Sequence, residues 1–247
     1  MLKRLKILVV LMASVVALLG VLAVLLPLSL VTSQLPATIQ LTNPQGNLAF
    51  GQADELVISG TSLGQLNWRF RPWLFWLGEP SWHLSLQTGW GELAADTTWV
   101  NGHRFDIDDL SLKGQMNSKW PVALPIQFGA DIEARVQHLR IEDDAITRLD
   151  GTITLKQLNL GDPATLLGDY LISTSPDING IAVGIKSDPS ALISTNLNLV
   201  IKPAHEYQLN GLVSSSSPAL QSLLAFIPNV AYNDGNGHMR FDVHGTY

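Results

Sequence analysis

The histidines are the first residues of this chain whose chemistry suggests a function. The chain has six, and imidazole is a common ligand of zinc. His238 and His244 would share one face of an extended strand, because they are six positions apart and side chains alternate between faces. Six residues of strand span about 20 Å, however, which is too far for two ligands of one ion. We therefore expect solvated strand histidines, and we predict no metal and no cofactor.

The acidic and hydroxyl residues do not form a catalytic pattern either. Asp234 lies in a Gly- and Asn-rich turn that is superficially similar to a calcium loop, but the other carboxylates of such a loop are missing. Asp106 and Asp108 are close in sequence, yet nothing places an acid–base partner beside them. Ser214–Ser217 lacks the Gly-x-Ser-x-Gly elbow of a hydrolase. Because the chain also has no cysteine, we do not expect an enzyme.

One stretch is dense enough in bulky aromatic residues to suggest recognition of a partner. It runs from Trp68 to Trp76 in a chain with seven tryptophans. Aromatic side chains and arginine are enriched at the centres of protein interfaces. Packing of the same side chains in a core, or against a membrane surface, is an open alternative. The possible partner interface comprises Trp68, Phe70, Arg71, Trp73, Phe75 and Trp76.

The elements that must position this segment are strands. After Gly46 apolar and polar residues alternate with period two, which predicts half-buried β-strands. The clearest strand runs from Ile126 to Val136, where the even-numbered residues are apolar. Similar alternation marks strands at Leu66–Phe70, Trp82–Leu86, Phe105–Ile107, Ile153–Leu155, Ile181–Ile185, Leu197–Ile201 and Met239–Val243. One wet face and no helical crossovers favour an antiparallel sheet.

Two of these strands change phase midway. The apolar residues switch from odd to even numbers after Ile107, and again after Leu155. A β-bulge or a sharp bend is the simplest cause, so we expect a strongly bent, largely antiparallel sheet. Asp150-Gly151 and Asn210-Gly211 are among the dipeptides that signal turns or strand starts.

Two short helices are predicted to interrupt the strands. Asp162 and Pro163 supply an N-cap and a first-turn proline, and Gly168 would end this helix. Apolar residues with helical spacing continue from Ser217 to Ile227. The second helix would cover one end of the sheet and protect its edge.

The N-terminal run from Ile7 to Val31 contains no charged side chain. It exceeds the ~20 apolar residues that span a bilayer, and it has no convincing cleavage site, so we expect an uncleaved anchor rather than a signal peptide. Lys3, Arg4 and Lys6 precede it, which places the N-terminus in the cytoplasm and the remainder outside. The predicted order is a cytoplasmic tail 1–6, a single transmembrane helix 7–31, a linker 32–45 and a β-rich domain 46–247.

The charge of the chain limits its partners. Fifteen Lys and Arg residues stand against 21 Asp and Glu residues, and the net charge is −6. Three of the cations precede the anchor, so the domain beyond it is more acidic still. This disfavours nucleic acid and anionic lipid headgroups as main partners.

The arrangement of these features resembles a known family. A short basic tail and a single anchor are followed by Gly60-Thr61, by Leu63-Gly64-Gln65-Leu66-Asn67-Trp68, by Pro72 and Leu74, and later by Trp99. This layout resembles the type II secretion system protein N family, also called general secretion pathway protein N. The family often has a tryptophan in its first Gly-Thr-x-Trp strand, whereas Leu63 stands at that place here.

The resemblance implies a function outside catalysis. It implies an accessory inner-membrane subunit of the machine that exports folded proteins across the outer membrane of Gram-negative bacteria. Its C-terminal domain would lie in the periplasm, its partners would be other inner-membrane or periplasmic secretion subunits, and it would need no catalytic residue.

The layout is also similar to that of AsmA-like proteins, which pair an N-terminal anchor with a curved sheet and handle lipids. An apolar face closed over by the helix Ser217–Ile227 would favour a protein-contact domain. An open apolar groove would favour the lipid-handling alternative.

Overall fold

The computed structural model describes residues 28, 38–72, 78–101, 103–116, 128–143, 145–160, 165–178, 180–202, 206–215, 217, 231–233 and 238–246. Within these residues the chain forms a single 15-stranded sheet. Every strand pairs antiparallel with its neighbours. The prediction of a mainly β, antiparallel fold is therefore confirmed.

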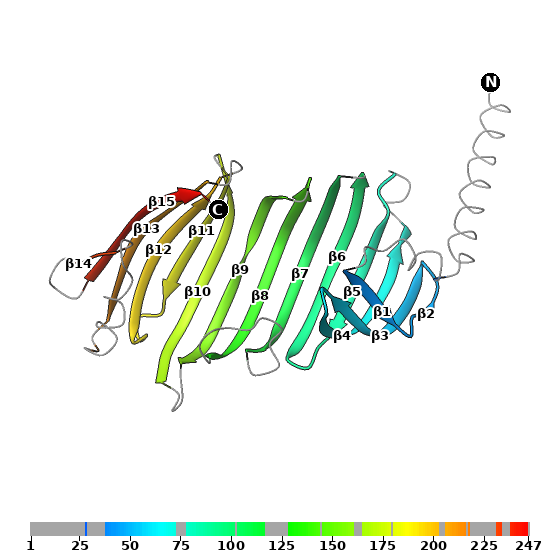
Figure 1. The fold of residues 1–247 in the computed structure, drawn as a ribbon, viewed down its shortest axis with the longest axis horizontal. Coiled ribbons are helices and arrows are strands. Elements are labelled where there is room, and N and C mark those ends of the chain that lie inside the picture. The colour runs from blue at the N-terminus through cyan, green and yellow to red at the C-terminus, as the bar shows by residue number, and fades with distance from the viewer. Residues whose placement is uncertain are drawn as a thin grey trace, which may run out of the picture.

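The strands follow one another across the sheet almost in chain order, and Figure 1 shows them side by side in one long, twisted layer. From β3 to β13 each strand pairs with the next in sequence; β1 and β2 both pair with β3, and β15 lies between β13 and β14. The strands are β1 (Ile39–Thr42), β2 (Gln45–Gly46), β3 (Phe50–Ile58), β4 (Thr61–Arg71), β5 (Ser81–Gln87), β6 (Gly91–Asn101), β7 (Arg104–Met116), β8 (Phe128–Glu142), β9 (Ala145–Leu160), β10 (Thr165–Asp177), β11 (Gly180–Ser187), β12 (Ile193–Ile201), β13 (Glu206–Ser215), β14 (Ala231–Asn233) and β15 (His238–Thr246).

The two predicted phase changes are confirmed as β-bulges. Asp109 in β7 and Gln157 in β9 have φ angles of 50° and 53°, in the left-handed region. The pairing register shifts beside each of them, between β6 and β7 and between β9 and both of its neighbours. An extra residue at each bulge returns the following apolar side chains to the same face.

The helix predicted from Asp162 to Gly168 is wrong. Strand β10 begins at Thr165, and its residues Leu166 and Gly168 pair with Asn159 and Leu158 of β9. The Asp-Pro signal precedes a strand here, because pairing with β9 satisfies the backbone groups that a short helix would leave open at its ends. The second predicted helix, from Ser217 to Ile227, lies outside the described residues except for Ser217.

Two other expectations also need correction. Within the segment 32–45, predicted as a linker, residues Ile39–Thr42 form β1 and pair with Glu55–Ile58 of β3. Gly211 is not in a turn but within β13, where a Cβ atom would lie 2.2 Å from the carbonyl oxygen of Asn196. Glycine is needed there because the neighbouring backbone comes so close. Asp150-Gly151 likewise lies inside β9.

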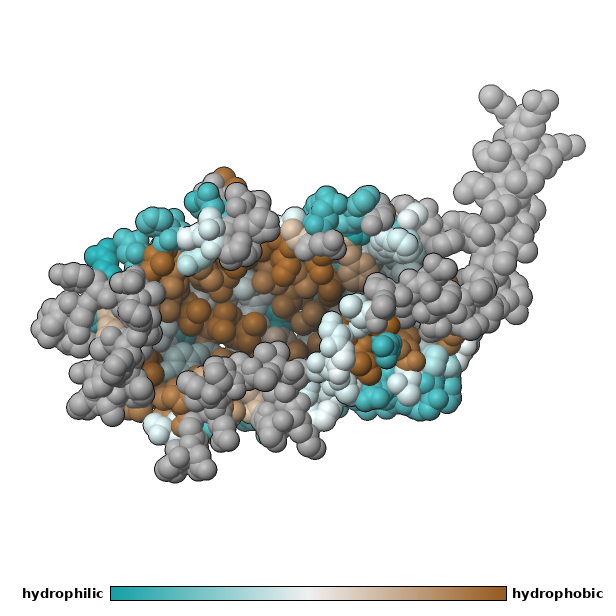
Figure 2. Space-filling view, viewed as in Figure 1, coloured by the Kyte–Doolittle hydropathy of each residue, from teal (hydrophilic) through white to brown (hydrophobic). Residues whose placement is uncertain are grey.

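The register separates the side chains into an apolar face and a polar face. One row of paired residues, which we call the apolar row, crosses the sheet from β4 to β15. It comprises Leu66, Leu86, Leu93, Leu112, Ala134, Ile153, Ile172, Ile185, Leu197, Gly211 and Phe241. Figure 2 shows apolar side chains gathered over the middle of the sheet.

The buried core is concentrated toward the C-terminal end of the sheet. One cluster contains Leu167 and Tyr170 of β10, and a second contains Val213 of β13 with Met239 and Phe241 of β15. The described strands make their main contacts with sheet neighbours rather than with a second layer. The sheet thus leaves much of its apolar face only half-buried.

The predicted anchor, Ile7–Val31, lies outside the described residues except for Leu28. The described residues include no helix that is both long and apolar enough to cross a membrane.

Candidate functional site

The predicted interface segment divides between the two faces of β4. Trp68 and Phe70 lie on the apolar face, in register with Leu84 and Trp82 of β5. Arg71 lies on the polar face, where its guanidinium group forms an ion pair with Asp96. The other three predicted residues, Trp73, Phe75 and Trp76, lie outside the described residues.

The tryptophans of this region hold a turn against the sheet. The indole Nε1 of Trp68 donates a hydrogen bond to the carbonyl oxygen of Asn47 at 2.8 Å, and Nε1 of Trp82 donates to that of Leu48 at 3.1 Å. The ring centroids of Phe70 and Trp82 are 5.6 Å apart at an interplanar angle of 60°, a tilted aromatic contact. These aromatic side chains therefore position the segment 47–50, which leads into β3.

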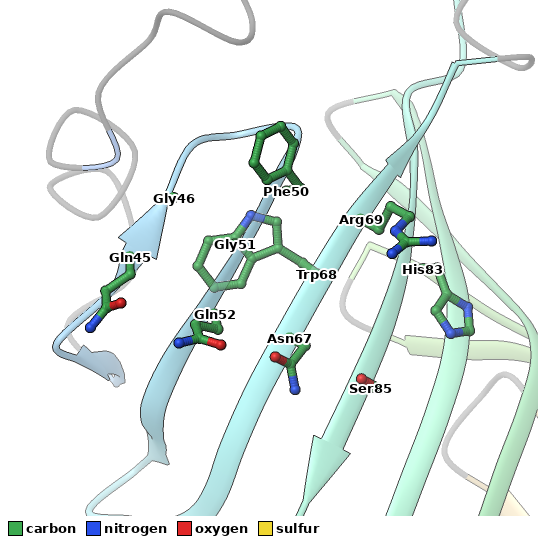
Figure 3. A pocket seen from close by; sticks show the side chains of 10 residues that line it. All are labelled: Gln45, Gly46, Phe50, Gly51, Gln52, Asn67, Trp68, Arg69, His83 and Ser85. Carbon is green, nitrogen blue, oxygen red and sulfur yellow. The ribbon is translucent and has the colours of Figure 1, made fainter.

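An open groove of about 630 Å³ lies beside this turn. Strands β2, β3, β4 and β5 form it, and we call it the Phe50–Arg69 groove after two residues that face each other across β3 and β4. Figure 3 shows Phe50 above the indole of Trp68, with Arg69 close to His83. The groove is lined by Gln45, Gly46, Phe50, Gly51, Gln52, Asn67, Trp68, Arg69, His83 and Ser85.

The groove depends on a glycine in β3. A Cβ atom at Gly51 would lie 2.3 Å from Cζ2 of Trp68 and 2.4 Å from the carbonyl oxygen of Gln45. Both distances are far below van der Waals contact, so a larger residue would displace the indole or the β2 backbone. Gly51 thus allows Trp68 and β2 to lie close against β3.

Two exposed side chains of the groove, Phe50 and Arg69, are available to contact a partner. Phe50 is 57% exposed, so much of its ring is available to a partner. Asp96 contacts two neighbours on this face: it forms an ion pair with Arg71, and one of its carboxylate oxygens lies 2.7 Å from Nδ1 of His83. Arg69 is exposed and has no carboxylate partner among the described residues. An exposed aromatic ring and a free guanidinium group therefore stand side by side.

A cluster of charged side chains farther along the polar face holds strands together and is not arranged for catalysis. Asp106, 7% exposed, accepts hydrogen bonds from Arg104 and Arg140, with closest distances of 2.6 and 2.9 Å. Burial raises the pKa of Asp106, but the hydrogen bonds from the two arginines outweigh burial, so this pKa lies below its ordinary value. A carboxylate oxygen of Asp108 contacts Nδ1 of His138. Asp106 and Asp108 thus contact separate partners and do not form an acid–base pair with each other.

No three His, Asp or Glu side chains in the described part of the chain lie close enough together to hold a metal ion. His238 and His244 pair with Ser214 and Gln208, six positions apart along the β13–β15 ladder.

Sequence reasoning missed Phe50, Arg69 and the glutamine side chains of the groove. Arg69 lies inside the aromatic segment, but its side chain is on the opposite face of β4 from Trp68 and Phe70. Phe50 comes from a different strand, and its position opposite Arg69 depends on the β3–β4 register, which shifts between Ala53 and Leu56. The sequence offered one signal for this site: an aromatic residue, Phe50, shortly after the turn dipeptide Gly46-Asn47.

A family model and a known relative both match this chain to the same family. Residues 37–241 match the family model described as type II secretion system (T2SS), protein N. The type II secretion system protein N of Vibrio cholerae serotype O1 is 26% identical over 261 residues, covering 96% of this chain and 94% of that protein. No solved structure matches the chain. The family match includes almost all of the sheet and confirms the resemblance in the sequence: the chain belongs to the type II secretion system protein N family.

Proposed function

We propose that this chain is an accessory component of the type II secretion system, held in the inner membrane by Ile7–Val31, with its sheet in the periplasm. Membership of the protein N family supports a role in the secretion machinery. The charge-free run behind Lys3, Arg4 and Lys6 supports the anchor and its orientation. In this role the sheet makes protein contacts and performs no chemistry.

The Phe50–Arg69 groove is the proposed contact surface. The observation that carries this proposal is the exposed pairing of Phe50 with Arg69 across β3 and β4. A phenyl ring offers apolar area at low entropic cost, and an arginine donates several hydrogen bonds in a fixed geometry. The amide side chains of Gln45, Gln52 and Asn67 add donors and acceptors for the backbone of a partner. The proposed contact surface therefore lies on the polar face, whereas the predicted residues Trp68 and Phe70 lie on the apolar face. Trp68 packs beneath the groove.

In-cell photo-crosslinking tests this surface. A photoreactive phenylalanine analogue in place of Phe50 should capture another secretion subunit, identified by mass spectrometry of the adduct. The matched control is Leu171, another exposed apolar residue that pairs with a cation, Lys186, on the polar face.

Capture of a secretion subunit from position 50 but not from position 171 is the expected result. Capture from position 171 alone would move the contact surface to β10 and β11. No subunit captured from either position, in cells that export normally, would contradict a contact role for the polar face.

A further inference from the structure

The Phe50–Arg69 groove contains two parallel rows of side chains from the polar face. The first row lies in direct register on β3, β4 and β5 and comprises Phe50, Arg69 and His83. The second, which we call the amide row, lies in register on β2, β3 and β4 and comprises Gln45, Gln52 and Asn67. The rows are two residues apart along β3 and β4, or ~7 Å. Figure 3 shows both rows along the groove.

The first row is positively charged. Among the described residues that line the groove, Arg69 and His83 are the ionisable ones, and none is an acid. Asp96 lies one strand beyond His83, and its two carboxylate oxygens contact His83 and Arg71. Arg69 itself forms no ion pair with any described residue. Its guanidinium group is therefore available to an anionic group of a partner.

The two acids of β3 do not neutralise this charge. Asp54 and Glu55 lie four and five residues along the strand from Phe50, at ~13 Å or more. Asp54 accepts a hydrogen bond from Nδ2 of Asn43 at 3.2 Å, and Glu55 accepts one from the hydroxyl of Ser62. A cationic group thus stands open beside an exposed phenyl ring on a chain whose net charge is −6. Charge complementarity calls for an acidic partner at this place.

The amide row is suited to the backbone of a polypeptide. None of its three side chains forms a hydrogen bond with a described residue. Gln45 is exposed, and Gln52 and Asn67 are half-buried. Each amide offers both donors and an acceptor. A peptide backbone also presents both, whereas a phosphate or another simple anion presents acceptors, so the amide row favours a protein segment as the occupant.

The register sets the spacing of the groups that the partner must present. Phe50 and Arg69 lie opposite each other on adjacent strands, so their backbones are ~5 Å apart. In an extended segment the side chains of alternate residues point the same way and are ~7 Å apart. The long side chain of Arg69 spans the difference. An apolar side chain and a carboxylate two positions apart therefore reach Phe50 and Arg69 together.

We propose that the groove binds an extended acidic segment of another secretion subunit, in which an Asp or Glu lies two positions from a large apolar residue. The carboxylate accepts hydrogen bonds from the guanidinium group of Arg69, the apolar side chain packs on Phe50, and the segment's backbone bonds to the amide row. The inference rests on the contact role proposed above, and it specifies the chemistry of the partner.

Crosslinking in cells combined with charge reversal tests this chemistry. A photoreactive phenylalanine analogue at position 50 keeps an aromatic ring there, and mass spectrometry of the adduct identifies the modified residue of the captured subunit. The yield of the adduct is then compared in full-length chains that carry Arg69→Glu or Arg69→Gln, at equal protein abundance. Lys186→Glu is the matched control, because Lys186 is an exposed cation of the polar face on β11.

The modified residue of the subunit should lie two positions from an Asp or Glu. Arg69→Glu should lower the yield several-fold and Arg69→Gln should lower it less, because like charges in contact oppose association. Lys186→Glu should leave the yield unchanged. Replacing the subunit's acid with arginine should restore the adduct of the Arg69→Glu chain, which a misfolded chain could not show.

Four results would overturn the acidic segment and leave the contact role of the groove standing. They are an adduct on a segment without an acid, a yield that Arg69→Glu does not change, a loss that the reversed subunit does not restore, and an equal loss with Lys186→Glu. If no secretion subunit is captured from position 50, the contact role itself is contradicted, and the acidic segment with it.

Discussion

At the scale of single residues, the strongest constraint on the polar face is Asp106. Both of its oxygens accept hydrogen bonds from Arg104 and Arg140, and the carboxylate is almost fully buried. Arg148 lies directly opposite Arg140 on β9, and its Nε atom is buried with no hydrogen-bond partner among the described residues. Asp106 is therefore the carboxylate that hydrogen-bonds both Arg104 and Arg140 in this cluster of guanidinium groups.

Replacing this carboxylate should destabilise the sheet. Asp106→Asn should lower the free energy of unfolding by about 2 kcal/mol at pH 7, because hydrogen bonds to charged groups are lost and two arginines are left unbalanced. Chemical denaturation of both proteins measures this difference. Asp131→Asn is the control, since Asp131 is exposed and accepts from the Gln115 side chain; its effect should be small.

The difference should also depend on pH. The folded-state pKa of Asp106 is lowered, so its contribution is complete above the ordinary pKa of the unfolded chain and is lost as pH falls through the folded value. Asp106→Asn and the parent protein should therefore converge in stability in acid. A difference that stays constant down to low pH would contradict this account of the cluster.

At the scale of elements, the bulges determine which face each side chain joins. Gln157 has a φ of 53°, and its backbone N–H donates a hydrogen bond to Oδ1 of Asp169 at 2.8 Å. Without this extra residue, Leu158 and Leu160 would point to the polar face. The bulge thus extends the apolar face to the end of β9.

Substitutions at Gln157 should change stability in opposite directions. Gln157→Gly should stabilise the protein by about 0.5–1 kcal/mol, because glycine adopts the left-handed region without strain. Gln157→Val should destabilise it by about 1–2 kcal/mol, because a β-branched residue is strained there. Thermal unfolding measures both. Gln115→Gly, in an ordinary strand position, should destabilise; stabilisation at both sites would show that the φ angle is not the cause.

The elements could be predicted where local pattern decides them. Alternation at Trp82–Leu86 or Leu197–Ile201 identifies strands because one face is apolar throughout, and the phase changes after Ile107 and Leu155 identify bulges. The helix at Asp162 was wrong because its cap signals are equally compatible with a loop before a strand. Local sequence does not reveal that β9 offers a ladder of partners to Leu166 and Gly168.

At the scale of the whole molecule, the candidate site was harder to predict than the fold. A sequence shows that Trp68 and Arg69 are adjacent but not which strand lies opposite. Phe50 and Arg69 become neighbours through the β3–β4 register, and that register contains a bulge. The hydrogen bonds from Trp68 and Trp82 to the turn at Asn47 and Leu48 are long-range contacts that no local pattern encodes.

The two faces give the molecule two separate surfaces on one layer. The polar face holds the Phe50–Arg69 groove, and the apolar face holds the apolar row. On β4 and β5, the two strands that contribute to both surfaces, alternate residues point to opposite faces, so a substitution on one face leaves the other face in place. The two surfaces can therefore be tested one at a time in the same protein.

The most direct test of the central claim is export of a secreted enzyme from cells that lack this gene and carry a variant copy. Phe50→Ala with Arg69→Ala should reduce enzyme in the medium toward the level of the deletion strain. Leu171→Ala with Lys186→Ala, an equivalent pair on β10 and β11, should restore export at equal protein abundance. Normal export by the deletion strain would contradict the secretion role. Full export with the Phe50 and Arg69 substitutions, where deletion abolishes it, would contradict the groove as its contact surface.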